Sequence, residues 1–161
     1  MAPRDGGGDM IETVAFDGST WNEVPYKFEA GTPDIAGAIG AAAALDYLAG
    51  IGLPAVAAHE HALLEYATER IRTVAGLRLV GTAANKGGIL SFVMDQAHPH
   101  DIGSILDQAG VAIRSGHHCT MPLMQRFQVP ATARASIAMY NGRDDIDQLI
   151  DALRTVARLF A

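Results

Sequence analysis

The spacing of the apolar residues changes at Gly76, and this change limits the folds open to the chain. Before Gly76, the segment 54–75 repeats its apolar residues at the spacing of a helix. After it, 77–82 and 88–95 have strand character and are separated by a short turn. The later segments predict a helix over 100–110, strands over 111–116 and 133–139, and an amphipathic helix over 143–160. A helix followed by strands that alternate with helices predicts an α/β or α+β domain built in layers.

The N-terminal region, residues 1–50, differs from the rest of the chain in its glycine and alanine content. Three consecutive glycines at 6–8 cannot pack a core, and they predict a loop or an extended arm. Residues 11–16 have strand character, and the alanine-rich segment 34–49 predicts a helix that ends at Gly50. This region therefore predicts an arm, a strand and a helix ahead of the layered domain.

Length, charge and cysteine content exclude several classes of protein. A chain of 161 residues that is 49% hydrophobic can bury one good core. The net charge of −6, without a basic cluster, argues against nucleic acid or an anionic membrane as the partner. The longest apolar stretch, 35–45, is shorter than the roughly 20 residues that span a bilayer. The N-terminus has no apolar signal segment, and a lone cysteine suits a reducing compartment, so we expect a cytoplasmic protein.

Cys119, the only cysteine, lies in the stretch "SGHHCTMP" over 115–122. Gly116 and Pro122 bound this stretch, which has neither strand nor helix periodicity and therefore predicts a loop. Free cysteines are usually buried and inert. Here two neighbouring imidazoles and Arg114 would favour the thiolate, so the residues predict a reactive thiol.

Two other chemistries use the same residue types. His117, His118 and Cys119 could ligate a metal, but adjacent residues rarely bind one ion together and no CxxC or HxxxH spacing is present. We therefore expect no metal site. A Cys-His hydrolase stays open, although no glycine pattern of an oxyanion hole accompanies the cysteine.

Three segments carry a resemblance to a known family: "YKFEAGTPDIAGAIGAAAALDYL" (26–48), "HPHDIGSILDQAGVAIRSGHHCTMPLM" (98–124) and "ARASIAMYN" (133–141). Together they resemble the SufS-type cysteine desulfurases of the class V aminotransferase family. The resemblance implies a homodimer with pyridoxal 5'-phosphate (PLP) and the aspartate-aminotransferase fold, PLP fold type I. Such enzymes take sulfur from L-cysteine, release L-alanine, and hold the sulfur as a persulfide for iron–sulfur cluster assembly.

The resemblance also implies roles for particular residues. Cys119 corresponds to the nucleophile that becomes the persulfide, Arg134 to the arginine that binds the substrate carboxylate, and Arg114 to an arginine of the same site. Thr32 and Gly31 correspond to a segment that reaches the cofactor phosphate of the partner subunit, and the glycines at 6–8 to a hook beside the neighbouring active site. Thr32 could instead cap the helix that follows it, and the glycines could form only a flexible arm.

The chain departs from the family in its lysines. Only Lys27 and Lys86 are present, and neither has the sequence context of the PLP lysine. The chain thus resembles the last part of a desulfurase. We expect 49–161 to be the C-terminal small domain, a sheet packed by helices, and 1–48 a remnant of the large cofactor domain. We also expect the isolated chain to bind no PLP covalently and to be inactive.

Several expectations about function and partners follow from the resemblance. Alternatives to the desulfurase segment are a PLP-free sulfur-carrier or interaction module, and a segment of a selenocysteine lyase. The partners implied are a second subunit, L-cysteine, and a sulfur acceptor of SufU or SufE type. His100 is expected to be a transient zinc ligand when such an acceptor binds, while the protein alone binds no zinc.

Overall fold

The computed structural model describes residues 1–161 and divides the chain into two compact units, Met1–Gly50 and Ile51–Ala161. The units meet two residues beyond the expected boundary between 48 and 49. Whether the first unit is the remnant of a larger cofactor domain stays a prediction.

The first unit contains a hairpin and a long helix. Its elements are η1 (Gly8–Met10), β1 (Ile11–Ala15), β2 (Gly18–Trp21), η2 (Tyr26–Phe28) and α1 (Ile35–Ile51). β1 and β2 are antiparallel, so the expected strand is one arm of a hairpin. Gly7 packs so closely against the backbone that an added Cβ would lie 2.9 Å from the Gly31 amide nitrogen. The arm therefore needs glycine at this position.

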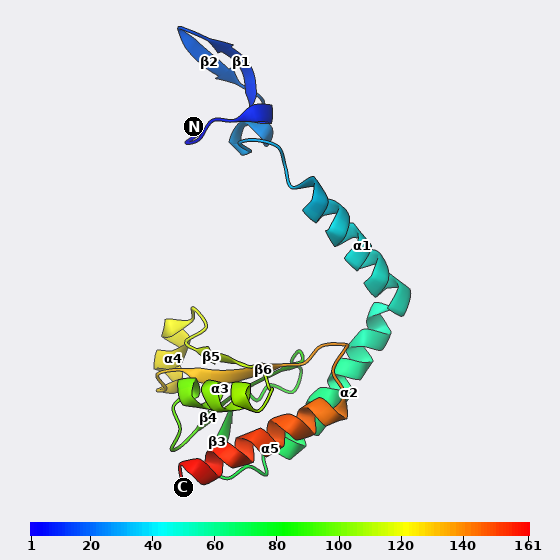
Figure 1. Ribbon diagram of the computed structural model, residues 1–161, viewed down its shortest axis with the longest axis vertical. Coiled ribbons are helices and arrows are strands. Elements are labelled where there is room, and N and C mark those ends of the chain that lie inside the picture. Colours follow the sequence, from blue (N-terminus) through cyan, green and yellow to red (C-terminus); the bar gives the residue numbers. More distant parts are fainter. The chain divides into compact units, whose positions relative to one another are not determined.

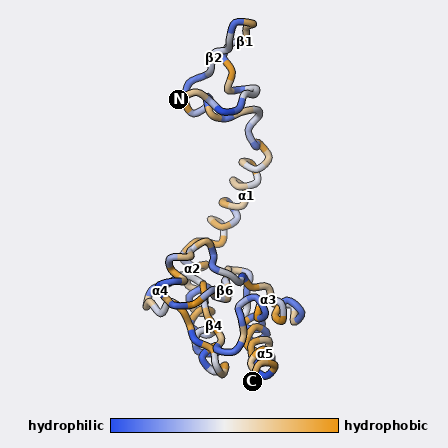
Figure 2. The backbone as a smooth tube through the Cα atoms, turned by 90° about the vertical axis from the view of Figure 1, so that its left-hand side faces the viewer, coloured by the Kyte–Doolittle hydropathy of each residue, from blue (hydrophilic) through white to orange (hydrophobic).

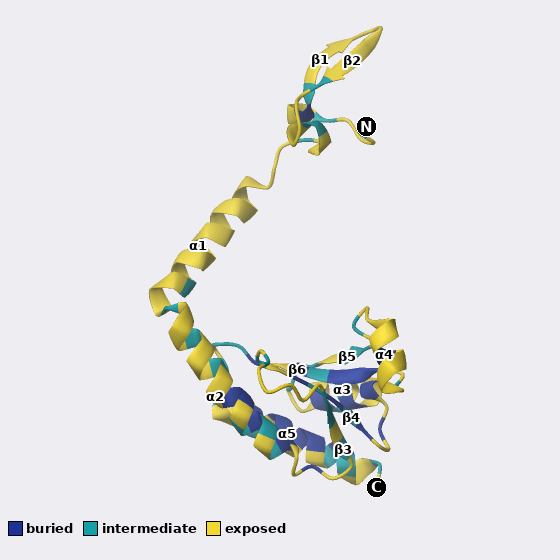
Figure 3. Ribbon diagram, turned by 180° about the vertical axis from the view of Figure 1, so that it is seen from behind, coloured by how far each residue is buried: buried dark blue, intermediate teal, exposed yellow.

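Helix α1 begins through a cap that the sequence analysis did not identify. The Asp34 carboxylate accepts the amide N–H of Gly37 over 2.8 Å, which satisfies a free donor of the first turn. No hydrogen bond joins Thr32 to the helix, so the alternative that Thr32 caps it is wrong. Helix α1 is mainly apolar along its length (Figure 2), and none of its residues is buried (Figure 3).

The second unit is a four-stranded antiparallel sheet with helices (Figure 1). The strand order is β3–β4–β6–β5. Its elements are α2 (Leu53–Ile71), β3 (Leu77–Val80), β4 (Ile89–Met94), α3 (Pro99–Gln108), β5 (Arg114–Gly116), α4 (Met121–Phe127), β6 (Thr132–Ser136) and α5 (Arg143–Leu159). All predicted helices and strands of this unit are present, and α4 is an addition. Several elements are shorter than expected, because 72–75, 81–82, 109–113 and 137–139 lie outside helices and strands.

The core lies on one face of this sheet. Leu90, Phe92 and Ala133 project from the central strands and are fully buried against α2, α3 and α5. Helix α5 supplies the expected inward row at helical spacing: Ile146, Leu149, Ile150, Leu153 and Val156. Because successive strand residues point to opposite faces, the residues between the buried ones point to the other face of the sheet.

Polar contacts fix α5 at both its start and its side. The Asp145 carboxylate accepts the Gly142 amide N–H over 2.9 Å, and this bond lowers the pKa of Asp145. The Asp147 carboxylate accepts from the Tyr66 hydroxyl at 2.8 Å and from the Arg70 guanidinium at 2.9 Å. These bonds join α5 to α2 beside the shared core.

No single helix in the structure is long and apolar enough to cross a membrane, and α1 and α2 reach that length only when counted together across their break.

Candidate active site

Cys119 lies in a tight turn between β5 and α4. Its backbone φ is 58° and that of His118 is 52°, so two consecutive residues other than glycine have left-handed conformations. The His117 side chain and carbonyl hold the turn, because Nδ1 accepts the Cys119 amide N–H at 3.0 Å and the carbonyl oxygen accepts the Thr120 hydroxyl at 2.8 Å. The thiol is free and exposed, which agrees with the predicted loop, and its reactivity stays a prediction.

His118 connects this turn to the sheet. Its Nε2 lies 3.0 Å from the hydroxyl and 3.2 Å from the carbonyl oxygen of Thr132, a residue of β6 that is only 1% exposed. Burial lowers the pKa of His118, and the charges of Arg134, Arg114 and His117 lower it further, against the opposing effect of the Thr132 bond. His118 is therefore neutral near pH 7. This imidazole therefore supplies no positive charge beside Cys119 near pH 7, contrary to the sequence-based expectation.

This lowered pKa predicts that His118 contributes to the pH dependence of stability. The unfolded chain binds a proton at His118 below about pH 6.5, whereas the folded chain binds it only at lower pH. Between the two pKa values the unfolded state holds more protons, so the free energy of unfolding should fall as the pH drops. Denaturant titrations above and below about pH 6.5 should show a smaller loss for His118→Asn than for the original chain. Equal losses would mean that His118 titrates normally in the fold.

Arg114 and Arg134 are directly opposite each other on the two adjacent strands β5 and β6. Opposed residues of an antiparallel pair point to the same face, so two guanidinium groups share the face of the sheet opposite the core. Neither takes part in an ion pair, since the three ion pairs of the chain involve α2 and α5. The Nε of Arg134 is also buried without a hydrogen-bond partner. Like charges held together without a carboxylate form a site suited to an anion such as a substrate carboxylate.

The other residues predicted for the site are Gly31 and Thr32 in the first unit and His100 on α3 of the second unit. Gly31 and Thr32 belong to the first unit, where Gly31 has φ of 94° and Thr32 is exposed. His100 is exposed at the start of α3 and lines a groove of about 320 Å³ with Ser104, Asp107 and Ser115. The structure contains no group of three or more His, Cys, Asp or Glu side chains placed to bind a metal.

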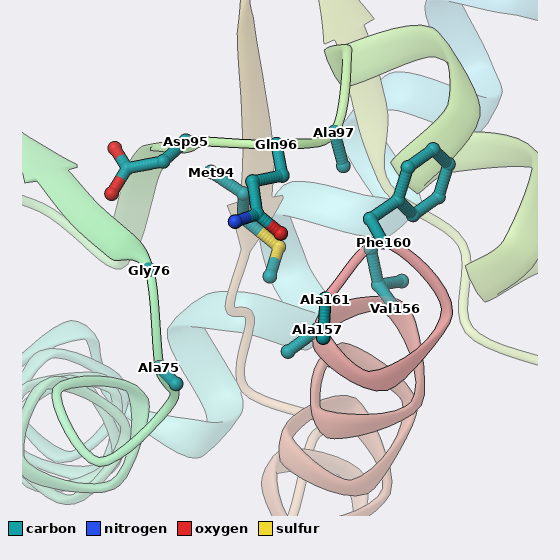
Figure 4. A pocket seen from close by; sticks show the side chains of 10 residues that line it. All are labelled: Ala75, Gly76, Met94, Asp95, Gln96, Ala97, Val156, Ala157, Phe160 and Ala161. Carbon is teal, nitrogen blue, oxygen red and sulfur yellow. The ribbon is translucent and has the colours of Figure 1, made fainter.

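A second pocket lies on the helix side of the second unit (Figure 4). It has a volume of about 280 Å³ and is lined mainly by apolar side chains, among them Met94, Val156 and Phe160. None of the residues expected to carry chemistry lines it. The chemical groups are therefore concentrated at the Cys119 turn and the arginine pair, and not in this pocket.

Comparison with known proteins identifies the family of the chain. The family model described as aminotransferase class V matches residues 1–149. The chain belongs to this family. A cysteine desulfurase of Klebsiella pneumoniae is 49% identical over 160 residues, which cover 99% of this chain and 39% of that protein. A probable cysteine desulfurase of Streptomyces coelicolor is 48% identical over 162 residues, again 99% of this chain and 39% of the relative.

Solved structures of class V proteins match the fold as well. The cysteine desulfurase CsdA of Escherichia coli, in an S-sulfonic acid form, has a TM-score of 0.86 at 35% identity, over 100% of this chain and 40% of that one. The apo cysteine desulfurase of Thermococcus onnurineus NA1 has a TM-score of 0.82 at 36% identity, over 94% and 38% of the two chains. The predicted family and the predicted PLP fold type I segment are confirmed, and the chain spans about two fifths of the relatives that it matches.

Proposed function

We propose that this class V chain is the segment of a cysteine desulfurase that receives sulfur on Cys119. One observation carries the proposal: an exposed free thiol lies in an ordered turn immediately after the strand that places Arg114 opposite Arg134. A thiol of this kind can attack a sulfur atom, and two unpaired guanidinium groups can bind the carboxylate of an amino acid.

The chemistry assigned to the chain balances without an added oxidant or reductant. The Cys119 sulfur forms a bond to the sulfur of L-cysteine, and the carbon–sulfur bond of the substrate breaks. The carbon keeps the electron pair and takes up a proton, so the products are L-alanine and a Cys119 persulfide. Arg134 and Arg114 bind the substrate carboxylate during this transfer, and the persulfide then serves an acceptor in iron–sulfur cluster assembly.

The residues present do not provide the covalent attachment that PLP needs. Lys27 lies beside the Phe28 ring, with 5.9 Å from Nζ to the ring centroid, in the first unit. Lys86 lines a groove with α2 residues such as Glu65 and Glu69. Within the second unit, Lys86 lines this α2 groove, and no contact joins it to the Cys119 turn or the arginine pair. PLP supplies the electron sink for such chemistry, and we therefore assign its lysine to the rest of the complete protein and derive no step through it.

We also propose that the partners of the complete protein include a second subunit. Helix α1 carries apolar residues all round, and Ile39 and Leu45 are each 67% exposed. A helix that is hydrophobic on every side is normally buried. We propose that the rest of the protein and a second copy cover this surface and remove it from water. The glycine arm at 6–8 would contribute to the same contact. His100 on the exposed start of α3 remains our proposed contact with a zinc-bearing sulfur acceptor.

The function is tested by joining this chain to the remaining part of a class V cysteine desulfurase. The joined protein should form alanine from L-cysteine in equal amount to the sulfur released, and product analysis with L-selenocysteine decides whether it is a selenocysteine lyase. The PLP-free sulfur carrier would be favoured by a different pair of results. The joined protein would form no alanine, and Cys119 of the isolated chain would take up sulfur from a persulfide donor. That second candidate is considered because no lysine accompanies the thiol.

Replacing Arg134 by lysine in the joined protein should weaken substrate binding. Lysine keeps the charge but loses the planar pair of donors, so the KM for L-cysteine is expected to rise by roughly tenfold or more. Steady-state kinetics measure the change. Arg126→Lys is the matched control, because Arg126 is exposed on α4 and makes no ion pair. An unchanged KM in Arg134→Lys would remove Arg134 from substrate binding.

A further inference from the structure

The hydrogen bonds of the Cys119 turn are local with one exception. Bonds from Cys119 and Thr120 to His117 close the turn on itself, and the Thr120 carbonyl begins α4. Only His118 bonds to a residue beyond the turn and α4, and its partner is Thr132. The position of the turn relative to the sheet therefore depends on this side chain, together with the packing of α4.

The backbone of the turn needs such support. His118 and Cys119 both have left-handed conformations that residues with a Cβ avoid, and these persist only where the surroundings hold them in place. The local bonds fix the shape of the turn. They do not fix the face of the sheet on which it lies.

Thr132 defines that face. It is two residues from Arg134 on β6, and residues two apart on a strand point to the same side. Its strand register places it opposite Gly116, two residues after the Arg114 that pairs with Arg134. A side chain that bonds to the Thr132 hydroxyl therefore lies on the face that carries both guanidinium groups.

We propose that His118 is a positioning residue whose Nε2–H bond to Thr132 holds the Cys119 thiol over the face that carries Arg114 and Arg134. The proposal rests on the proposed function only in naming the substrate carboxylate as the group that binds there. The Thr132 carbonyl can only accept, so Nε2 carries the hydrogen and Nδ1 keeps a lone pair. Nδ1 is buried without a partner, which disfavours a second N–H at that atom. The lowered pKa of His118 agrees with this neutral ring.

Alkylation of the 161-residue chain tests this position without PLP or L-cysteine. The measured quantity is the ratio of the alkylation rate with anionic iodoacetate to the rate with its neutral analogue iodoacetamide. This ratio should be higher for a thiol near two arginines than for a free thiol, because the guanidinium groups attract the anion. His118→Asn keeps a residue that tolerates the left-handed conformation but is too short to reach Thr132. We expect the iodoacetate-to-iodoacetamide rate ratio to fall by roughly threefold in this variant. His61→Asn, at an exposed α2 histidine whose ring nitrogen lies 3.5 Å from the Glu65 carboxylate, should leave the ratio unchanged.

Two further measurements keep the proposal open to refutation if His118→Asn does not fold. Thr132→Val removes the hydroxyl but leaves the carbonyl, so it should lower the rate ratio by a smaller factor. Nitrogen-15 NMR of the original chain should show His118 with hydrogen on Nε2 and none on Nδ1. An unchanged ratio in a folded His118→Asn, or hydrogen found on Nδ1, would overturn the positioning role. Either result leaves the sulfur-transfer proposal untouched, since that depends on persulfide formation.

Discussion

Replacing Cys119 by serine is expected to end sulfur transfer in the joined desulfurase. A serine hydroxyl can occupy the same exposed turn, but it cannot form a persulfide. Because Cys119 is the only cysteine of this segment, no neighbouring thiol can take its place. Alanine formation should fall by several orders of magnitude, the scale seen when an enzyme loses its nucleophile. Amino-acid analysis after incubation with L-cysteine gives the rate.

The same variant should fold normally, because the Cys119 side chain is exposed and its substitution buries nothing new. We expect a change of no more than about 0.5 kcal/mol in the free energy of unfolding. Serine at position 119 of the isolated chain also provides the blank for all alkylation measurements. Retained alanine formation in a well-folded Cys119→Ser protein would assign the sulfur-accepting role to another residue.

Replacing Phe92 by alanine should produce the largest loss of stability among single core changes. Phe92 is fully buried at the centre of β4, against the helices of the second unit. Removing its ring leaves a cavity and should lower the free energy of unfolding by about 3–5 kcal/mol. Phe16 lies at the exposed end of the β1–β2 hairpin, so Phe16→Ala is the matched control and should change little.

Far-UV circular dichroism during denaturant titration is the suitable measurement. The only tryptophan, Trp21, belongs to the first unit, so its fluorescence would not follow unfolding around Phe92. A loss of less than about 1 kcal/mol would contradict a well-packed core on this face of the sheet.

The sequence predicted the layered second unit because its apolar spacing is strong. The amphipathic pattern of α5 and the alternation in β4 each identify the buried face directly. Helix α4 was missed because Met121–Phe127 is short and follows a loop motif with proline near its start. The strand expected over 111–116 is shorter because only its last three residues pair with β6. Pairing of this kind depends on a distant strand, which local pattern does not report.

The motifs predicted the loop around Cys119 and selected Arg114 and Arg134 as candidates, and the roles of these residues stay predictions. The direct opposition of the two arginines followed only from the strand register. The His118–Thr132 bond was missed, although the two-residue spacing of Thr132 and Arg134 on one strand was a signal that they share a face.

The most direct test of the account is detection of the persulfide itself. The joined desulfurase should be incubated with L-cysteine, alkylated, digested and examined by mass spectrometry. We predict that the peptide containing Cys119 carries one additional sulfur atom, that dithiothreitol removes it, and that alanine forms in equal amount. Two results would contradict the central claim that this turn receives the sulfur. Alanine could form while the added sulfur is found on another residue, or it could form while Cys119 stays unmodified throughout turnover.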